Sequence, residues 1–579
     1  MKKIIISIVM ATMACGNQAC GGVLEDVLLE AACSGNTVRI EQLLQLGIKI
    51  DLGASNKEGI APLACAVANN HCDVADLLLT HGANPSIRDR FRRTLLFDAS
   101  MKGFPCVTAT LLRHGVDPDA SDAEGLTPLF LAVSHGNNRD VVEILINHGA
   151  NINAVTNQTN ETPLFRAVYC NRNEMAELLL GKGADATVTS RNSGNTAFHV
   201  AVEMGNLAVV KTFLQFKVNI DERNNQGDTV LIIASRMGHS EIVGLLIDHG
   251  ADPGIVNKNG LNCLLEAVSA GRTLLVESLL ARGMPLSMRE GHNRTALILA
   301  VISRNSRVVE SVIKRGVNLN DKDNEGKTAL MHASLIGNRD AAAMLLDAGA
   351  DFTLRDSNGD TALLQAAARG DKSIVSLLLD KKARIDEVAR SGRTPLHKAS
   401  EYGHLEVVRE LLARGADIEA IDRESKASAL HLASAGGHEQ VVNVLLGKDA
   451  NPNVLDGFSQ TPVHKAAFKG SAAIIAMLID GGASIDAKDQ AGKTPLMMAC
   501  ERGYVEAVRY FLKNGADINA TDNLHWTPLF WAVFYGHYDT ANLLLQKGAN
   551  KKQKDRKGLT ALDYAREQRQ GYLVDLLKQ

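Results

Sequence analysis

Aromatic residues are scarce in this chain of 579 residues: they make up 4 % of it, and only two of them are tryptophan. Any core must therefore be built from aliphatic side chains and alanine. Proline is also rare, at 13 residues, and no apolar run approaches the ~20 residues that a membrane-spanning helix needs. Neither charge predominates, since 62 basic residues stand against 65 acidic ones. This balance argues against a surface devoted wholly to nucleic acid or anionic membrane.

Sequence motifs that carry chemistry are missing or incomplete. The chain has no His-Glu-x-x-His and no Cys-x-x-Cys. Gly326–Thr328 and Gly492–Thr494 resemble the end of a phosphate-binding loop, but neither has the required glycine five residues upstream. Asp321–Gly326 resembles the start of a calcium loop, whose twelfth position holds His332 instead of glutamate. We therefore expect no catalytic site, no metal and no cofactor, and no binding of nucleic acid.

The nine cysteines do not share a position in the sequence pattern described below, so a repeated disulfide is not expected. We interpret those within the pattern as small core residues and reject a disulfide framework. They lie at positions 15, 20, 33, 65, 72, 106, 170, 263 and 500.

One short phrase, Thr-Pro-Leu-x-x-Ala, returns along nearly the whole chain at intervals of 33 to 35 residues. The segment that begins at Val23 reads as a degenerate earlier copy. A repeat of this length indicates a single stacked array instead of several independent domains. The phrase begins at Ala61, Thr94, Thr127, Thr162, Thr196, Thr229, Asn262, Thr295, Thr328, Thr361, Thr394, Ser428, Thr461, Thr494, Thr527 and Thr560.

Each copy predicts two short helices. The hydroxyl at position 1 can cap a helix, and proline suits the first helical turn at position 2. Position 6 is always alanine, which predicts a close helical neighbour, and position 10 is glycine in 12 copies, where a left-handed residue can end the helix. A second apolar helix follows, then a turn rich in Asp, Asn and Gly. Four histidines at position 4 can hydrogen-bond the adjacent turn: His199, His397, His431 and His464.

The period and the signature Thr394–Ala399 (Thr-Pro-Leu-His-Lys-Ala) resemble the ankyrin repeat family. The resemblance implies an all-α dominated solenoid of about seventeen helix-loop-helix units with β-hairpin fingers. It also implies a monomeric, non-enzymatic protein that binds partner proteins on its concave face. We divide the chain into residues 1–22 (leader and linker), 23–60 (N-terminal capping repeat), 61–559 (repeat array) and 560–579 (C-terminal capping repeat).

The first residues read as an export leader. Two lysines precede the apolar run Ile4–Ala14, which is too short to span a bilayer but fits a secretory signal peptide. Cleavage after Gly16, or before a lipidated Cys15, would both be compatible with this sequence. We expect an exported protein (periplasmic, envelope-attached or secreted); a cytoplasmic protein with an apolar extension is the alternative.

In the ankyrin family, partner contacts usually come from the finger residues just before position 1 and from positions 8 and 9. The resemblance therefore implies a partner-binding surface where aromatics gather in these columns. We predict a protein-binding scaffold; a host-directed effector that uses the same surface and a mechanical spacer are alternatives, and an enzyme is disfavoured. The alternative for Trp526 and Phe534 is that they shield the last repeat. The predicted contact residues are Tyr402, Phe458, Phe468, Trp526, Phe534 and Tyr535.

Overall fold

A computed structural model of the chain describes residues 21–45, 51–53, 55, 60–135 and 138–579. Over these residues the chain forms 34 helices. It divides into two compact units, residues 1–279 and 280–579. The leader, Cys15 and Cys20 lie outside the described residues.

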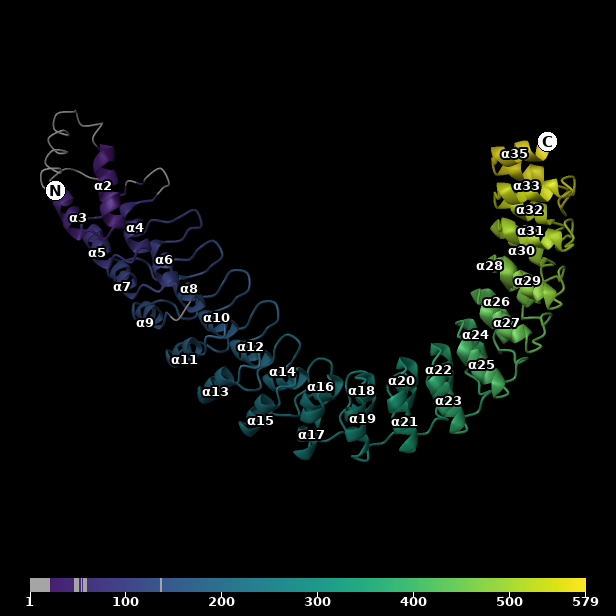
Figure 1. Ribbon diagram of the computed structural model, residues 1–579, viewed down its shortest axis with the longest axis horizontal. Helices are drawn as coiled ribbons and strands as arrows, with labels where there is room; N and C mark the ends of the chain where they lie inside the picture. Colours follow the sequence, from purple (N-terminus) through teal and green to yellow (C-terminus); the bar gives the residue numbers. More distant parts are fainter. Residues whose placement is uncertain (1–20, 46–50, 54, 56–59, 136–137) are drawn as a thin grey trace. The chain divides into compact units, whose positions relative to one another are not determined.

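The helices alternate between a first and a second helix of each repeat (Figure 1). The first helices are α2 (Gly21–Cys33), α4 (Pro62–Ala68), α6 (Leu95–Lys102), α8 (Pro128–Ser134), α10 (Pro163–Tyr169), α12 (Ala197–Glu203), α14 (Val230–Met237), α16 (Cys263–Ser269), α18 (Ala296–Ile302), α20 (Ala329–Ile336), α22 (Ala362–Arg369), α24 (Pro395–Glu401), α26 (Ala429–Gly436), α28 (Pro462–Lys469), α30 (Pro495–Arg502), α32 (Pro528–Phe534) and α34 (Ala561–Glu567). The second helices are α3 (Thr37–Leu44), α5 (Cys72–Thr80), α7 (Pro105–Arg113), α9 (Arg139–Asn147), α11 (Asn173–Gly181), α13 (Leu207–Gln215), α15 (Ser240–Asp248), α17 (Thr273–Ala281), α19 (Ser306–Ile313), α21 (Arg339–Asp347), α23 (Lys372–Asp380), α25 (Leu405–Ala413), α27 (Glu439–Leu446), α29 (Ala472–Asp480), α31 (Val505–Lys513), α33 (Tyr538–Gln546) and α35 (Gly571–Lys578).

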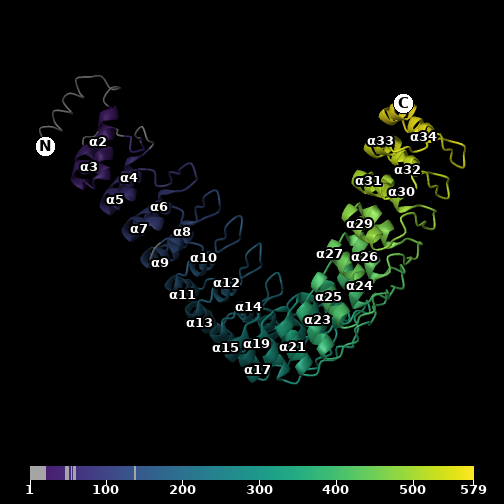
Figure 2. The ribbon, with the colours of Figure 1, turned by 45° about the vertical axis from the view of Figure 1, so that its right-hand side comes forward.

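Within each unit the helices form two rows. In the first unit, α4, α6, α8, α10, α12 and α14 pack in sequence beside the finger loops, and the second helices form the other row (Figure 1). In the second unit, the row that contains α24, α26, α30, α32 and α34 likewise lies next to the fingers (Figure 2). Helices of seven to nine residues are too short to persist alone, so stacking of neighbours holds them.

The helix ends confirm the predicted caps. The Thr127 hydroxyl accepts a hydrogen bond from the Phe130 N–H at 3.3 Å. In most other repeats the position-1 side chain likewise accepts from the backbone N–H three residues later. Where position 10 is a described glycine, it has a positive φ, as Gly403 has at 76°. The four repeats without glycine there use the same left-handed conformation, which favours glycine but is open to asparagine. These residues are Asn70, Asn171, Arg304 and Arg569.

The position-6 alanines lie at the tightest point of the stack. Every one of them, from Ala66 to Ala565, has no exposed surface. A larger side chain there would separate two adjacent first helices. The alternation of a bulky residue at position 3 with alanine at position 6 therefore sets the spacing of the first-helix row.

The fingers are turns, not the β-hairpins that the resemblance implies. Over the described residues they contain only isolated antiparallel bridges, such as Arg88–Thr94. A carboxylate closes most of these turns instead: one oxygen of Asp522 accepts the N–H groups of Leu524 and Trp526 at 2.8 and 2.9 Å. Single hydrogen bonds link successive fingers, as when the Asn523 N–H donates to the Ala491 carbonyl at 2.9 Å. The side-chain cap leaves too few backbone pairs for a ladder.

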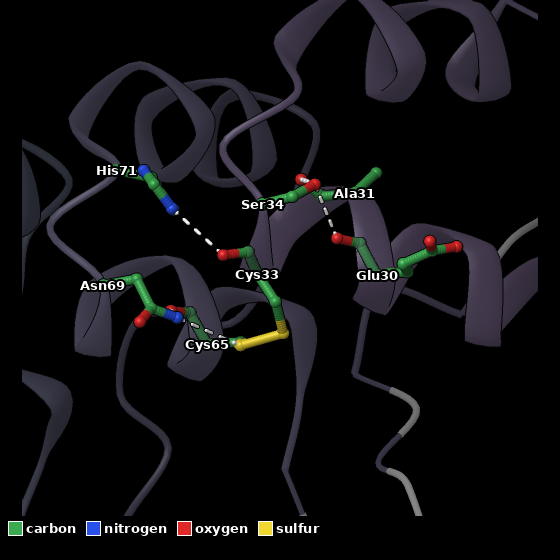
Figure 3. Close-up of a disulfide and its surroundings, with 7 residues drawn as sticks. All are labelled: Glu30, Ala31, Cys33, Ser34, Cys65, Asn69 and His71. Carbon is green, nitrogen blue, oxygen red and sulfur yellow. Dashed lines mark hydrogen bonds between the residues drawn. A yellow bond between two sulfur atoms is a disulfide. The ribbon is translucent and has the colours of Figure 1, made fainter.

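The rejection of disulfides is wrong for the N-terminal repeats. Cys33 on α2 is bonded to Cys65 on α4, with Cα atoms 5.0 Å apart (Figure 3). Cys72 on α5 is bonded to Cys106 on α7, with Cα atoms 5.8 Å apart. The two cysteines of each pair do not occupy the same repeat position. They are 32 residues apart in the first pair and 34 in the second, which is close to one period, so they face each other on neighbouring helices. Cys263 and Cys500 are buried core residues, as predicted.

Candidate protein-binding surface

Five of the six predicted contact residues are accessible on the second unit. Tyr402, Phe458, Phe468 and Tyr535 are 55, 60, 47 and 49 % exposed. Phe534 is half-buried. Large aromatic side chains in contact with solvent are informative because they are so scarce in this chain.

The expectation that Trp526 is exposed is wrong, because only 7 % of its surface is accessible. Its ring packs against Trp531 and Phe534 with centroids 5.0 Å away in both cases. The Trp526 side chain also contacts the next finger, where the indole Nε1–H donates to an Asp555 carboxylate oxygen at 3.4 Å. Trp526 therefore packs in the core of the last repeats and contacts the Phe534 ring. This agrees with the alternative interpretation, in which Trp526 shields the last repeat.

A buried polar layer fixes this aromatic cluster. The Tyr564 hydroxyl donates to Asp555 at 2.7 Å, and the Trp531 Nε1–H donates to Asp522 at 3.0 Å. Burial opposes ionisation of Asp555, but hydrogen bonds from the Tyr564 hydroxyl and finger N–H groups hold its pKa below the usual value. Burial beside this carboxylate raises the pKa of Tyr564 to about 12, so the hydroxyl remains a donor.

Trp526→Ala should destabilise the C-terminal repeats by about 3–5 kcal/mol, because it removes a buried ring and leaves a cavity. Hydrogen exchange should rise from about residue 494 to the C-terminus and remain unchanged in the first unit. Tyr535→Ala, at a half-exposed position in the same repeat, is the control and should change stability by less than about 1 kcal/mol. Equal stability of the two variants would show that Trp526 is not a core residue.

Cations lie against two rings of this region, the exposed Phe468 and the buried Trp531. The Arg502 guanidinium lies 3.9 Å from the centre of the Phe468 ring, and Lys493 Nζ lies 3.3 Å from the Trp531 ring. Lys493 is neutralised by Glu501 at 2.8 Å. Arg502 and the neighbouring exposed Lys469 make no ion pair within the described part of the chain. The uncompensated charge on this surface is therefore positive.

We call Phe458, Phe468, Lys469, Arg502, Phe534 and Tyr535 the aromatic strip. α30, which carries Arg502, packs between α28 and α32, so the strip is continuous over three neighbouring repeats. Tyr402 lies farther along the same row. One repeat separates it from the strip, and that repeat has only Ala435 and Gly436 at positions 8 and 9. The prediction from the sequence named the rings of the strip but not Lys469 and Arg502, although both occupy position 9 of their repeats.

The structure also accounts for the incomplete metal and nucleotide motifs. Asp323 of the calcium-like loop caps its own finger and contacts His332 at 2.7 Å. Thr328 and Thr494 are helix caps. In the part of the chain that the structure describes, no group of His, Cys, Asp and Glu residues is arranged to hold a metal ion. Over the same residues, no helix is long and apolar enough to cross a bilayer.

A stack of capped helix pairs, linked finger to finger and carrying an exposed strip, defines a repeat solenoid. The family model for ankyrin repeats (3 copies) matches residues 7–89, 96–190, 183–257, 264–356, 349–422, 430–522 and 520–579. The chain belongs to the ankyrin repeat family.

Similar proteins come from animals and plants. The chain is 34 % identical to the mouse (Mus musculus) B-cell lymphoma 3 protein homolog over 181 residues, 31 % of this chain and 40 % of that protein. It is 30 % identical to mouse NF-kappa-B inhibitor delta over 187 residues, 28 % of this chain and 57 % of that protein. It is 27 % identical to the Arabidopsis thaliana E3 ubiquitin-protein ligase KEG over 245 residues, 34 % of this chain and 15 % of that protein. The matched region thus spans less than two thirds of each relative.

Proposed function

We propose that this chain is a non-catalytic scaffold that binds a partner protein through the aromatic strip of its second unit. One observation carries the proposal: exposed rings gather along one row of first helices and the finger beside it, and cations lie over two of them, Phe458 and Phe468. Tyr402 extends the contact surface, and Trp526 supports it without touching the partner.

The energetics favour a binding role for the strip. Aromatic residues and arginine dominate binding hot spots, where truncation of one side chain costs about 2 kcal/mol or more. The Phe468 ring already lies against Arg502 and Phe534 against the buried Trp526, so little side-chain freedom is lost on docking. Lys469 and Arg502 leave positive charge unpaired on this surface. We therefore infer that the partner presents apolar side chains next to carboxylates.

We propose that the protein acts outside the reducing cytoplasm. Two disulfides in the first three repeats support this, because such bonds form and persist in oxidising compartments. The leader-like start of the sequence points the same way. Delivery to a host cell would use the same binding surface. A mechanical spacer is the weaker proposal, since the aromatics concentrate in one part of the array.

The strip is tested by capture of proteins from native extract with the full chain. Phe468→Ala combined with Tyr535→Ala should weaken capture of the specific partner at least tenfold, because two anchors are lost. Thermal stability should barely change, since both side chains are half-exposed. Tyr538→Ala, an exposed tyrosine on the second helix of the same repeat, is the matched control and should bind normally. Undiminished capture by the double variant would refute the assignment, and capture lost on nuclease treatment would point to nucleic acid instead.

A further inference from the structure

The first unit contains a cavity that the strip does not explain. Its volume is about 420 Å³, and it lies between the fingers and the first helices of neighbouring repeats. Met101, Leu126, Phe130 and Leu131 give it an apolar lining. Met101 and Leu126 also pack on a buried core cluster. A partly open hollow of this size, with an apolar wall and polar groups around it, has room for a side chain.

Two irregularities of the repeat meet at this cavity. The finger 156–161 is one residue longer than a regular finger. Its Thr156 hydroxyl accepts a hydrogen bond from the N–H of Glu161, five residues later in the chain. In a regular finger such as that of Asp122, a carboxylate accepts the N–H of the residue four positions later. Thr156, Gln158 and Thr159 of this finger line the cavity. On the helix side, Ser134 at the end of α8 lines it, before another loop with an additional residue. The hollow therefore lies where the sequence departs from the regular period of the repeat.

Two exposed aromatics lie beside arginines that line the cavity. Phe91 is 48 % exposed, and its ring centre lies 5.4 Å from the Arg93 guanidinium. Tyr169 is 64 % exposed and lies 5.9 Å from the Arg166 guanidinium. Phe91, Met101 and Tyr169 are far apart in the sequence, but in the structure Met101 lines the cavity and the other two rings lie against arginines that line it.

The polar groups at the cavity suit a peptide backbone better than a charged ligand. Arg93 is neutralised by Asp122 at 3.2 Å. Arg166 donates to the Ser134 hydroxyl at 3.2 Å and has no carboxylate partner among the described residues, so N–H groups remain available. The carboxylates of Glu124 and Glu161 also line the cavity and can accept. An extended segment presents both N–H and C=O groups, which these donors and acceptors match.

We propose that this cavity is a second protein-binding site, which takes one leucine-sized or phenylalanine-sized side chain from an extended, weakly charged segment of a partner protein. The apolar lining binds the anchor, while Phe91 and Tyr169 cover its flanks. Arg166 and Glu161 bind the backbone on either side. This site does not depend on the aromatic strip, because it lies in the other unit and differs from it in local charge.

Selection from a phage-displayed library of random 12-residue peptides on the full chain tests this site. We expect a family of binding peptides that share one Leu, Ile, Met or Phe anchor without a run of like charges. The synthetic peptides should lose at least tenfold in affinity when Arg166→Ala and Tyr169→Ala are combined. Lys182→Ala, at the exposed end of α11 in the same repeat, should leave their affinity unchanged.

Two further measurements separate this site from the strip and from misfolding. Circular dichroism and thermal melting of the Arg166→Ala/Tyr169→Ala variant should match the parent chain, since both side chains are at the surface. Phe468→Ala with Tyr535→Ala should not affect these peptides, even if it abolishes partner capture. The proposal is overturned if no selected peptide depends on Arg166 and Tyr169, or if the dependent peptides share only a charged run and no apolar anchor.

Discussion

Acidification from pH 7.5 to 5.5 should open the repeats between residues 394 and 493 before most of the second unit. Three consecutive position-4 histidines lie there, His397, His431 and His464, each with at most 1 % of its surface exposed. In each ring Nδ1 accepts the N–H of the residue at position 1, at 3.1 to 3.2 Å. The Nε2–H then donates to a carbonyl of the next finger, at 2.9 to 3.2 Å. Protonation of Nδ1 would break the first bond and charge a buried ring.

The direction of the effect follows from the pKa values. Burial lowers the pKa of all three histidines below the ordinary value of about 6.5. Below pH 6.5 the unfolded chain therefore binds more protons than the folded one, so stability is complete above that pH and falls as the pH decreases. The loss by pH 5.5 is at most about 1.4 kcal/mol per histidine, or about 4 kcal/mol for the three, a limit set by native rings that take up no proton. Nearby Asp422 and Asp456 have pKa values held below their usual range and stay ionised.

The chain supplies its own control for the acid effect. Met331 and Met497 occupy the same position 4 in other repeats and are buried there. Replacing the three histidines with methionine should remove most of the pH dependence, whatever it does to stability at pH 7.5. Hydrogen exchange of peptides from residues 394–493, compared between parent and variant at each pH, measures this. An equal loss of protection in both proteins at pH 5.5 would show that other groups cause the acid transition.

Reduction of the two disulfides should destabilise the first three repeats and leave the second unit unchanged. The bridges close segments of 32 and 34 residues, for which loop-closure entropy predicts about 3–4 kcal/mol each. Among the described residues, α2 and α3 pack mainly against each other and against α4 and α5 of the next repeat, so less packing retains them than retains a repeat with neighbours on both sides. One bridge joins the first helices α2 and α4, and the other joins the second helices α5 and α7, so together they fasten both rows.

Hydrogen exchange with and without a reductant measures this effect. Protection from exchange should fall in peptides that cover the helices α2 to α7 and should remain unchanged in the second unit. Cys33→Ser with Cys65→Ser, and Cys72→Ser with Cys106→Ser, should reproduce the loss without reductant. Cys500→Ser, at a buried free thiol, controls for the substitution itself and should respond to reductant as the parent does. Unchanged exchange on reduction would mean that packing alone secures these repeats.

The sequence was sufficient to predict the features that each repeat determines locally. The cap at position 1, alanine at position 6 and histidine at position 4 act on groups one turn or one finger away, so their chemistry follows from spacing alone. His431, for example, contacts Ser428 of its own repeat and Gln460 of the next finger. A period near 33 residues converts each such local rule into a rule for the whole array.

Features that depend on contacts between non-equivalent positions were not predictable. Trp526 lies in a finger, but its side chain packs inward against the Trp531 ring and bonds to Asp555 of the following finger. Cys33 and Cys65 occupy different columns and meet only because their helices are neighbours. The cavity of the first unit likewise requires a long finger and residues from several repeats.

Crosslinking mass spectrometry on the native complex tests the central claim, that the aromatic strip is the partner-binding surface, most directly. An amine-reactive crosslinker should join the partner to Lys469 and to the nearby Lys465 or Lys493 of the first-helix row. Lysines at the ends of the second helices of the same unit, Lys513 and Lys547, should form few or no crosslinks to the partner. Crosslinks confined to Lys513, Lys547 and the second-helix row would place the partner on the opposite surface and contradict the account.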